Sequence, residues 1–148
     1  MTHPPLLLPP IHPRVDTRDG ESYIFDPIRK KMLLLTPEEW VRQHFVNLLK
    51  EHLGYPAGLF QLQKQHTYSG ALKRTDITVL DKMGNPFLLV ECKAYDVSIN
   101  EATLKQIATY NKTLKAKYIA VTNGLKHFVW QLQAAGYQQL GEFPRYAD

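Results

Sequence analysis

The chain contains 148 residues, 44% of them hydrophobic and 22% charged, with a formal net charge of +4. This length and composition indicate one globular domain with its own hydrophobic core. No apolar run approaches the roughly 20 residues of a membrane span, the N-terminus lacks the features of a secretory signal, and the single cysteine, Cys92, excludes an intramolecular disulfide. We therefore expect a cytoplasmic protein whose mildly basic character, with a pI near 9.1, is compatible with a polyanion partner.

Residues 1–20 are proline-rich, and we expect them to form an extended arm that crosses the domain or a partner. A flexible segment is the alternative. Residues 21–148 are expected to form a single domain. It begins with a hairpin, with strands at residues 22–25 and 31–35, that covers an edge or a face of the main sheet.

A helix is predicted at residues 37–53, because Thr36 can cap its N-terminus, proline is favoured at the first helical position and Glu39 completes a capping box. Glu38 lies one turn before the apolar stripe of this helix and can face inward. It is therefore a candidate acidic group of a functional site. The alternative is that Glu38 only complements the helix macrodipole.

The rest of the chain alternates between strand patterns and one further helix. A loop is expected at residues 69–73, and a second helix from Ser98 or Asn100 to about Leu114. Strands are predicted at residues 59–68, 75–80, 87–92, 117–122, 128–132 and 137–143. The order helix, three strands, helix, strand predicts an α/β domain with a mixed sheet, in which the second helix links two parallel strands.

Charged residues interrupt the apolar strand predicted at residues 87–92. Glu91 and Lys93 lie on one face of this strand, because side chains alternate across it. An antiparallel hairpin places the start of the preceding strand beside the end of this one, so Asp76 falls roughly opposite Glu91. Two carboxylates and a lysine are therefore expected to meet at one end of the hairpin.

Two carboxylates on rigid strands suit Mg²⁺, which takes only one or two protein carboxylates and leaves other positions to water and substrate phosphate. A lysine beside that metal can position the attacking water or offset charge on a phosphorus transition state. Asp76, Glu91 and Lys93 therefore predict metal-assisted phosphodiester hydrolysis. The alternative is a surface hairpin with an ordinary salt bridge between Glu91 and Lys93.

Further polar residues lie near this trio in the predicted fold. Lys73 and Arg74 precede Asp76 and could contact phosphate or pair with the acids, and a solvated basic pair is the alternative. Gln106 and Tyr110 are spaced i, i+4 on the second helix, so they stack above one another.

These features, in this order, resemble the PD-(D/E)xK nuclease superfamily: an acid on the first helix, Asp76 on a middle strand and Glu91-Cys92-Lys93 on the next. QIATY, at residues 106–110, matches the Q-x-x-x-Y element of its RecB-like branch. KRTDITVLDKMGNPFLLVECKA and QIATYNKTLKAKYIAVTNG are similar to the nuclease domain at the N-terminus of the type I restriction endonuclease motor subunit. Thr75 stands where the name of the superfamily has proline.

The resemblance implies a restriction-endonuclease-like core (αβββαβ, a mixed central sheet flanked by helices) with an N-terminal hairpin and C-terminal accessory strands. It also implies a Mg²⁺-dependent DNA endonuclease, with Mn²⁺ as an alternative metal. Asp76, Glu91 and the backbone carbonyl of Cys92 would hold the metal, Lys93 would be the catalytic lysine, and Glu38 would complete the site. Gln106 and Tyr110 would support the positioning of substrate or of the lysine. For such an enzyme we expect contacts with the phosphate backbone from Lys73 and Arg74, and from Arg42 or Lys105.

The sequence contains no GxxxxGK[ST] loop, so we expect no nucleotide-driven motor within this chain. DNA is the expected partner, and a separate motor or specificity protein, or a second copy of the chain, could join it; a membrane partner is not expected. The alternative function is a nucleic-acid-binding or assembly module that keeps the fold without cutting. A third reading is a structural ion pair in a protein of unrelated function.

Overall fold

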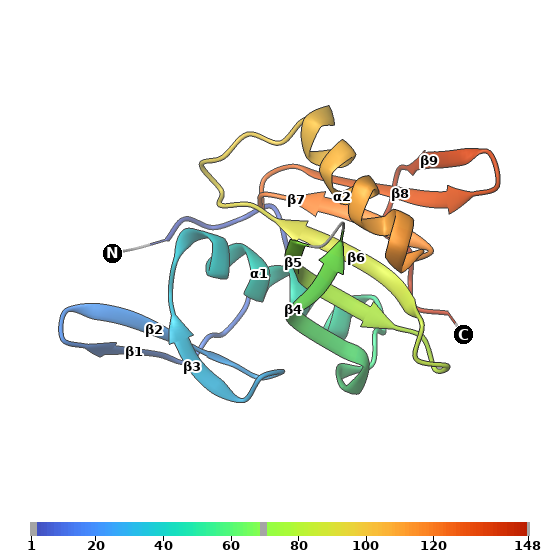
Figure 1. The fold of residues 1–148 in the computed structure, drawn as a ribbon. Helices are drawn as coiled ribbons and strands as arrows, with labels where there is room; N and C mark the ends of the chain where they lie inside the picture. Colours follow the sequence, from blue (N-terminus) through green and yellow to red (C-terminus); the bar gives the residue numbers. More distant parts are fainter. Residues whose placement is uncertain (1–2, 69–70, 148) are drawn as a thin grey trace.

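The computed structural model describes residues 3–68 and 71–147, with side chains described outside residues 64–73 (Figure 1). In chain order the elements are β1 (Val15–Arg18), β2 (Glu21–Asp26), β3 (Lys31–Leu34), α1 (Pro37–Asn47), η1 (Leu48–His52), η2 (Ala57–Leu59), β4 (Phe60–Tyr68), β5 (Ala71–Leu80), β6 (Pro86–Cys92), α2 (Glu101–Leu114), β7 (Tyr118–Thr122), β8 (His127–Gln133) and β9 (Gly136–Leu140).

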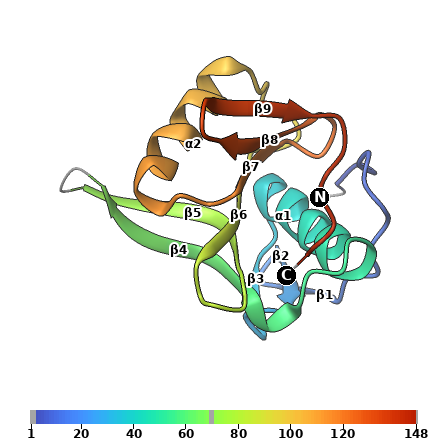
Figure 2. The ribbon, with the colours of Figure 1, turned by 90° about the vertical axis from the view of Figure 1, so that its right-hand side faces the viewer.

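The main sheet has six strands in the order β4-β5-β6-β7-β8-β9. Its strands pair antiparallel except β6 and β7, which are parallel and joined through α2. The predicted mixed α/β architecture is confirmed. Figure 2 shows α1 and α2 on opposite sides of this sheet. Strand β6 therefore lies between the two helices.

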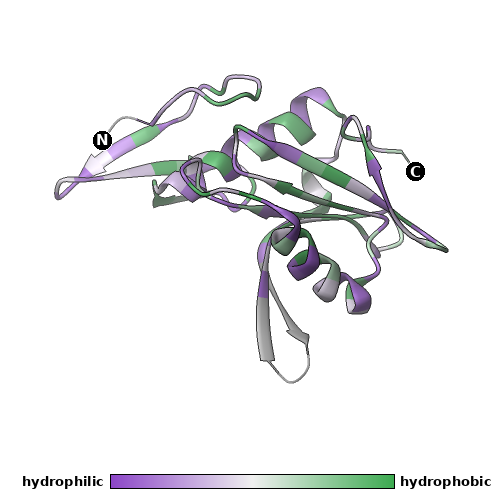
Figure 3. Ribbon diagram, turned by 90° about the horizontal axis from the view of Figure 1, so that it is seen from above, coloured by the Kyte–Doolittle hydropathy of each residue, from purple (hydrophilic) through white to green (hydrophobic). Residues whose placement is uncertain are grey.

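Each face of the main sheet carries its own hydrophobic core. Leu88 and Val90 pack with Val41 and Phe45 of α1, whereas Leu89 packs with Ile107 of α2 and the neighbouring strands. Hydrophobic residues accordingly concentrate along the strands and the helices beside them (Figure 3). In the part of the chain that the structure describes, neither helix has the length and apolar character needed to cross a bilayer.

The N-terminal hairpin forms a sheet of its own. β1 joins β2 and β3 in an antiparallel three-stranded sheet that is separate from the main sheet. Within the extended arm expected at residues 1–20, Val15–Arg18 form a strand that pairs with β2, which the sequence analysis did not foresee. The hairpin also adds no strand to the main sheet, and its turn packs instead against α1.

The first residues of the described chain cross the domain, as one of the two alternatives for the arm expected. Leu6 is buried, and the backbone N–H of Leu7 donates to the carbonyl of Gly124 at 2.9 Å. Gly124 has φ +85°, and a Cβ there would lie 2.9 Å from the Leu6 side chain. Glycine is thus required at the turn between β7 and β8 for the arm to pack closely.

Helix α1 begins as predicted but differs at two points. The hydroxyl of Thr36 accepts a hydrogen bond from the backbone N–H of Glu39 at 3.0 Å. The predicted capping box is wrong, because the backbone N–H of Thr36 donates to Leu34 and the Glu39 side chain turns inward to charged partners. The predicted helix to residue 53 is α-helical only to Asn47, and it continues as the π-helical segment η1.

A smaller correction concerns the loop expected at residues 69–73. Strand β5 already begins at Ala71, so the connection to β4 is shorter than predicted, and residues 69 and 70 lie outside the described part of the chain. The prediction of a cap for the second helix was right for Asn100, whose side chain accepts from the N–H of Ala102 at 2.9 Å.

The C-terminal end of α2 depends on one buried amide. Asn111 is 1% exposed; its Nδ2 donates to the Ala116 carbonyl at 3.0 Å, and its Oδ1 accepts from the Ala116 N–H at 2.7 Å. We expect Asn111→Ala to lower the free energy of unfolding by about 2–4 kcal/mol, because two buried backbone groups lose their partner. Urea denaturation measures this, with the exposed neighbour Lys112→Ala as control. Equal stability of the two variants would contradict the expectation.

Candidate active site

The acidic residues of the site lie where β5 and β6 run side by side. Ile77 of β5 pairs with Val90 of β6, so the next positions along the two antiparallel strands are Asp76 and Glu91. Ile77 and Val90 belong to the core beside α1 and form the last residue pair of β5 with β6 at this end, so Asp76 and Glu91 stand just beyond the paired segment. The N–H of Cys92 donates to Asp76 Oδ2 at 2.8 Å and fixes that carboxylate across the two strands.

Lys93 follows directly after β6 and belongs to the same group. Its backbone N–H donates to the carbonyl of Thr122 at 2.8 Å, which extends the ladder between β6 and β7. Its Nζ lies 3.2 Å from Glu91 Oε1, and 31% of the side chain is exposed. The ammonium group therefore stands at the end of the sheet, in contact both with a carboxylate and with solvent.

The two carboxylates interact strongly. Burial, followed by the negative charge of Asp76, raises the pKa of Glu91 to about 7, although Lys93 opposes the shift. Burial and the charge of Asp76 also raise the pKa of Glu38, against the charges of Arg42 and Lys93. Three acidic groups thus share one electrostatic environment in which full ionisation is costly without a further cation.

Arg42 of α1 connects the helix with the strands. Its guanidinium donates to Glu38 Oε1 at 2.8 Å, to Glu39 Oε1 at 2.6 Å and to Asp76 Oδ1 at 2.8 Å. Arg42 is only 2% exposed. All three donated bonds go to carboxylates within the domain, and a contact of Arg42 with the phosphate backbone stays a prediction.

The thiol of Cys92 plays no part in this chemistry. Cys92 is 1% exposed, and burial together with the charge of Asp76 raises the pKa of its thiol. A neutral, buried thiol is a small hydrophobe, not a nucleophile. The carbonyl of Cys92 stays a predicted ligand.

The predicted substrate residues lie on β5 and α2, and their roles stay predictions. Arg74 is exposed on β5, two residues before Asp76, and the side chain of Lys73 lies outside the described part of the chain. On α2, Gln106 Nε2 donates to the Tyr110 hydroxyl at 3.2 Å, as their i, i+4 spacing suggested. Lys105 on the same helix is exposed.

The residues present fit a divalent cation by charge and by donor type. Asp76 and Glu91 supply carboxylate oxygens, Glu38 stands beside them on Arg42, and a bound cation would lower the cost of ionising these acids together. Each carboxylate oxygen has two lone pairs, so Asp76 can keep its present partners and still accept a metal. Among the residues described, no three His, Cys, Asp or Glu side chains form a ready-made metal cage. A site of two carboxylates completed by water suits Mg²⁺.

Sequence reasoning missed the residues that support Arg42. Asp26 and Arg29, in the turn between β2 and β3, form an ion pair at 2.6 Å, and Arg29 Nη2 lies 3.2 Å from Glu39 Oε2. The only signal in the sequence was the turn-forming Asp26-Pro27, which predicts a turn but not its partners.

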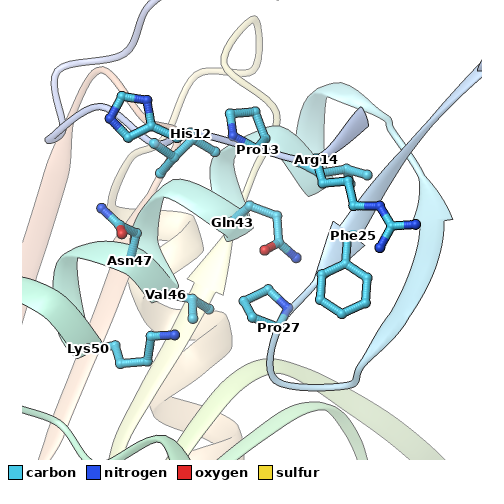
Figure 4. Close-up of a pocket in the computed structure, with 11 residues that line it drawn as sticks. His12, Pro13, Arg14, Phe25, Pro27, Gln43, Val46, Asn47 and Lys50 are labelled. Atoms are coloured by element: carbon cyan, nitrogen blue, oxygen red, sulfur yellow. The ribbon is translucent and has the colours of Figure 1, made fainter. Parts of the chain in front are cut away.

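A pocket of about 230 Å³ lies apart from these carboxylates, between the N-terminal arm, β2 and the other side of α1. Figure 4 shows Arg14, Phe25 and Gln43 around it. None of the predicted site residues lines this pocket.

The arrangement defines a mixed α/β domain with an acidic centre and a lysine at one end of its sheet. Its fold is similar to the fragment structure of an HsdR subunit of a type I restriction enzyme from Vibrio vulnificus, with a TM-score of 0.57 and 22% sequence identity. The match covers 74% of this chain but only 24% of the other, so the chain spans about a quarter of that protein's length. A search of curated proteins gave no match.

Residues 37–144 match the family described as type I restriction enzyme R protein N terminus (HSDR_N), and the chain belongs to this family. The resemblance inferred from the sequence is thereby confirmed. The matched residues begin at α1 and include Asp76, Glu91 and Lys93.

Proposed function

We propose that this domain is a Mg²⁺-dependent DNA endonuclease that hydrolyses phosphodiester bonds. Its core would be restriction-endonuclease-like, formed by α1, β4, β5, β6, α2 and β7 in the order αβββαβ. Membership of the R-protein family supports the proposal. The observation that carries it is the meeting of Asp76, Glu91 and Lys93 at one end of the sheet, with the pKa of Glu91 raised to about 7.

Asp76, Glu91 and the carbonyl of Cys92 would hold the metal, which when bound would supply Lewis-acid stabilisation of charge on the phosphate. Arg42 holds one oxygen of Asp76 and the Cys92 N–H holds the other, so this carboxylate stands preoriented. Lys93, at 3.2 Å from Glu91, would orient the attacking water. Glu38, held by Arg42 at 2.8 Å, would accept hydrogen bonds from water beside the two ligands.

DNA would bind through contacts with its backbone. Arg74 and Lys105 are exposed, and with Lys73 they form the basic set of the proposal. Gln106 and Tyr110 would support substrate from α2. Contacts of this kind carry little sequence information and weaken as salt rises. A separate motor or specificity protein would then choose the site of cleavage.

Incubation of supercoiled plasmid with the protein in Mg²⁺, Mn²⁺ or EDTA tests the proposal. We expect nicked and linear DNA with either metal and intact plasmid in EDTA. Absence of cleavage across metals and salt concentrations would contradict the proposed endonuclease activity. DNA binding that persists in EDTA, without cleavage in any metal, would instead support a binding or assembly module.

A further inference from the structure

A second set of charged side chains lies behind the candidate site, between the N-terminal sheet and α1. Asp26, at the end of β2, is fully buried, and its Oδ1 accepts from the backbone N–H groups of Ile28 at 2.7 Å and Arg29 at 2.9 Å. Its Oδ2 accepts from Arg29 Nε at 2.6 Å and from Gln43 Nε2 at 3.1 Å. The turn between β2 and β3 thereby fixes the direction of the Arg29 guanidinium.

Arg29 carries this arrangement to the candidate site through α1. Its Nη2 lies 3.2 Å from each carboxylate oxygen of Glu39. Glu39 Oε1 in turn accepts from Arg42 Nη1 at 2.6 Å, and Arg42 Nη2 donates to Asp76 Oδ1 at 2.8 Å. Positive and negative groups therefore alternate from Asp26 to Asp76, and each holds the next in one orientation.

Arg29 also reaches the strand beside Asp76. Its Nη1 donates to Gln63 Oε1 at 2.6 Å. Gln63 lies in β4 at the position that faces Asp76, and there the otherwise regular pairing of β4 with β5 has no residue pair. Its φ is +53°, a left-handed conformation that is unfavourable for a residue other than glycine. The same arginine, Arg29, thus donates hydrogen bonds both to the strained Gln63 and to Glu39.

This arrangement is a poor device for stability alone. Glu39 is 5% exposed and Arg42 2%, and Arg42 Nε has no hydrogen-bond partner among the described residues. Removing such charges from water costs several kcal/mol per ion, and apolar side chains of similar volume commonly stabilise a fold as well or better. The strained residue Gln63 and the buried charge of Arg42 both lie next to Asp76, the carboxylate whose orientation the candidate site requires.

We propose that Arg29 is a positioning residue for the Asp76 carboxylate, acting through Glu39 and Arg42 on one side and through Gln63 on the other. Arg29 precedes the residues matched to the family, which begin at position 37, so the N-terminal sheet becomes part of the site's support. The consequence for metal binding rests on the proposed function. The orientation of the Asp76 carboxylate does not rest on the proposed function, and it can be measured separately.

The N–H of Cys92 reports on this orientation, because it donates to Asp76 Oδ2. In ¹⁵N-labelled Arg29→Ala we expect the Cys92 amide resonance to shift and its hydrogen exchange to accelerate at least about tenfold, since the opening of this bond becomes easier. In the same samples we expect the dissociation constant for Mn²⁺ to rise about tenfold, as is usual when the support of a ligand is removed.

Two variants separate positioning from general stability. Arg18→Ala removes an exposed arginine of the same N-terminal sheet, paired with Asp16 at 3.7 Å, and should change neither the Cys92 amide nor the Mn²⁺ affinity. Asn111→Ala lowers stability at the end of α2 and should leave the Mn²⁺ affinity unchanged. Arg29→Lys keeps the charge but lacks the planar fork that reaches Asp26, Glu39 and Gln63, so it should restore the wild-type amide only in part.

An unmoved Cys92 amide in folded Arg29→Ala would overturn the proposal. If that variant does not fold, the nearly isosteric Glu39→Gln provides the same test with the same readouts, because it breaks the path between Arg29 and Arg42. Absence of Mn²⁺ binding by the wild-type protein would remove the proposed function, and the Cys92 amide would still decide whether Arg29 positions Asp76.

Discussion

Replacement of Lys93 by methionine is expected to lower plasmid cleavage roughly 10²- to 10³-fold, the loss that follows removal of one preorganised charged donor from a hydrolytic site. Methionine keeps most of the volume of lysine but has no ammonium group. Since 31% of the Lys93 side chain is exposed and its ion pair among the described residues is with Glu91, the fold should tolerate the change. Lys126→Met, at an exposed lysine in the turn between β7 and β8, is the matched control.

The pH dependence of the residual activity gives a second readout. The ammonium of Lys93 lowers the pKa of Glu91, so its removal raises that pKa further above the wild-type value of about 7. Because the metal requires ionised Glu91, the activity remaining in Lys93→Met should move to higher pH. Unchanged cleavage by Lys93→Met, with wild-type cleavage still abolished by EDTA, would show that lysine is not part of the reaction.

Replacement of Glu91 by glutamine is expected to stabilise the metal-free protein at pH 8 and to abolish its response to metal. The pKa of Glu91 is about 7 in the folded protein and about 4.5 in the unfolded chain, so the folded state binds its proton more tightly. Stability from this group is therefore highest below about pH 4.5 and is lost as pH rises through 7. The loss amounts to roughly 3.4 kcal/mol at most, at 1.36 kcal/mol per pKa unit over the shift from 4.5 to about 7.

Urea denaturation in EDTA at pH 5 and pH 8 measures this effect. Relative to wild type, Glu91→Gln should gain stability between the two pH values, whereas Glu142→Gln, at an exposed position, should not. Addition of Mn²⁺ at pH 8 should raise the melting temperature of wild type but not of Glu91→Gln, because ligand bound only to the folded state stabilises it. A Glu91→Gln variant less stable than wild type at pH 8 would contradict the raised pKa.

The central acids and lysine could be predicted from the sequence because their placement follows from local rules. Side-chain alternation relates Glu91 to Lys93, and the short turn between β5 and β6 fixes which residue of one strand lies near which of the other. The position of Asp76 also depends on a bulge that shifts this register by one residue between Val79 and Leu80, which the sequence does not reveal. The parallel pairing of β6 with β7 followed from the helix between them.

Contacts between distant segments could not be predicted in this way. The spacing of Glu38 and Arg42 suggests an i, i+4 pair on a helix, but nothing local reveals that the same guanidinium reaches Asp76. Glu39 has the position of a capping residue. Its carboxylate instead pairs with the guanidinium of Arg29, a stronger partner than the backbone N–H at the helix end. The support of Asp76 therefore depends on tertiary contacts, whereas the placement of Glu91 and Lys93 could be inferred from strand patterns.

Anomalous X-ray diffraction from crystals soaked in Mn²⁺ at pH 8 tests most directly whether the domain gathers a cation at its acidic end. The account predicts one strong peak within ligand distance of the carboxylates of both Asp76 and Glu91, and none there in crystals of Glu91→Gln. A fully occupied Mn²⁺ site elsewhere in the crystal, with Asp76 and Glu91 keeping only the partners they have without metal, would contradict the account.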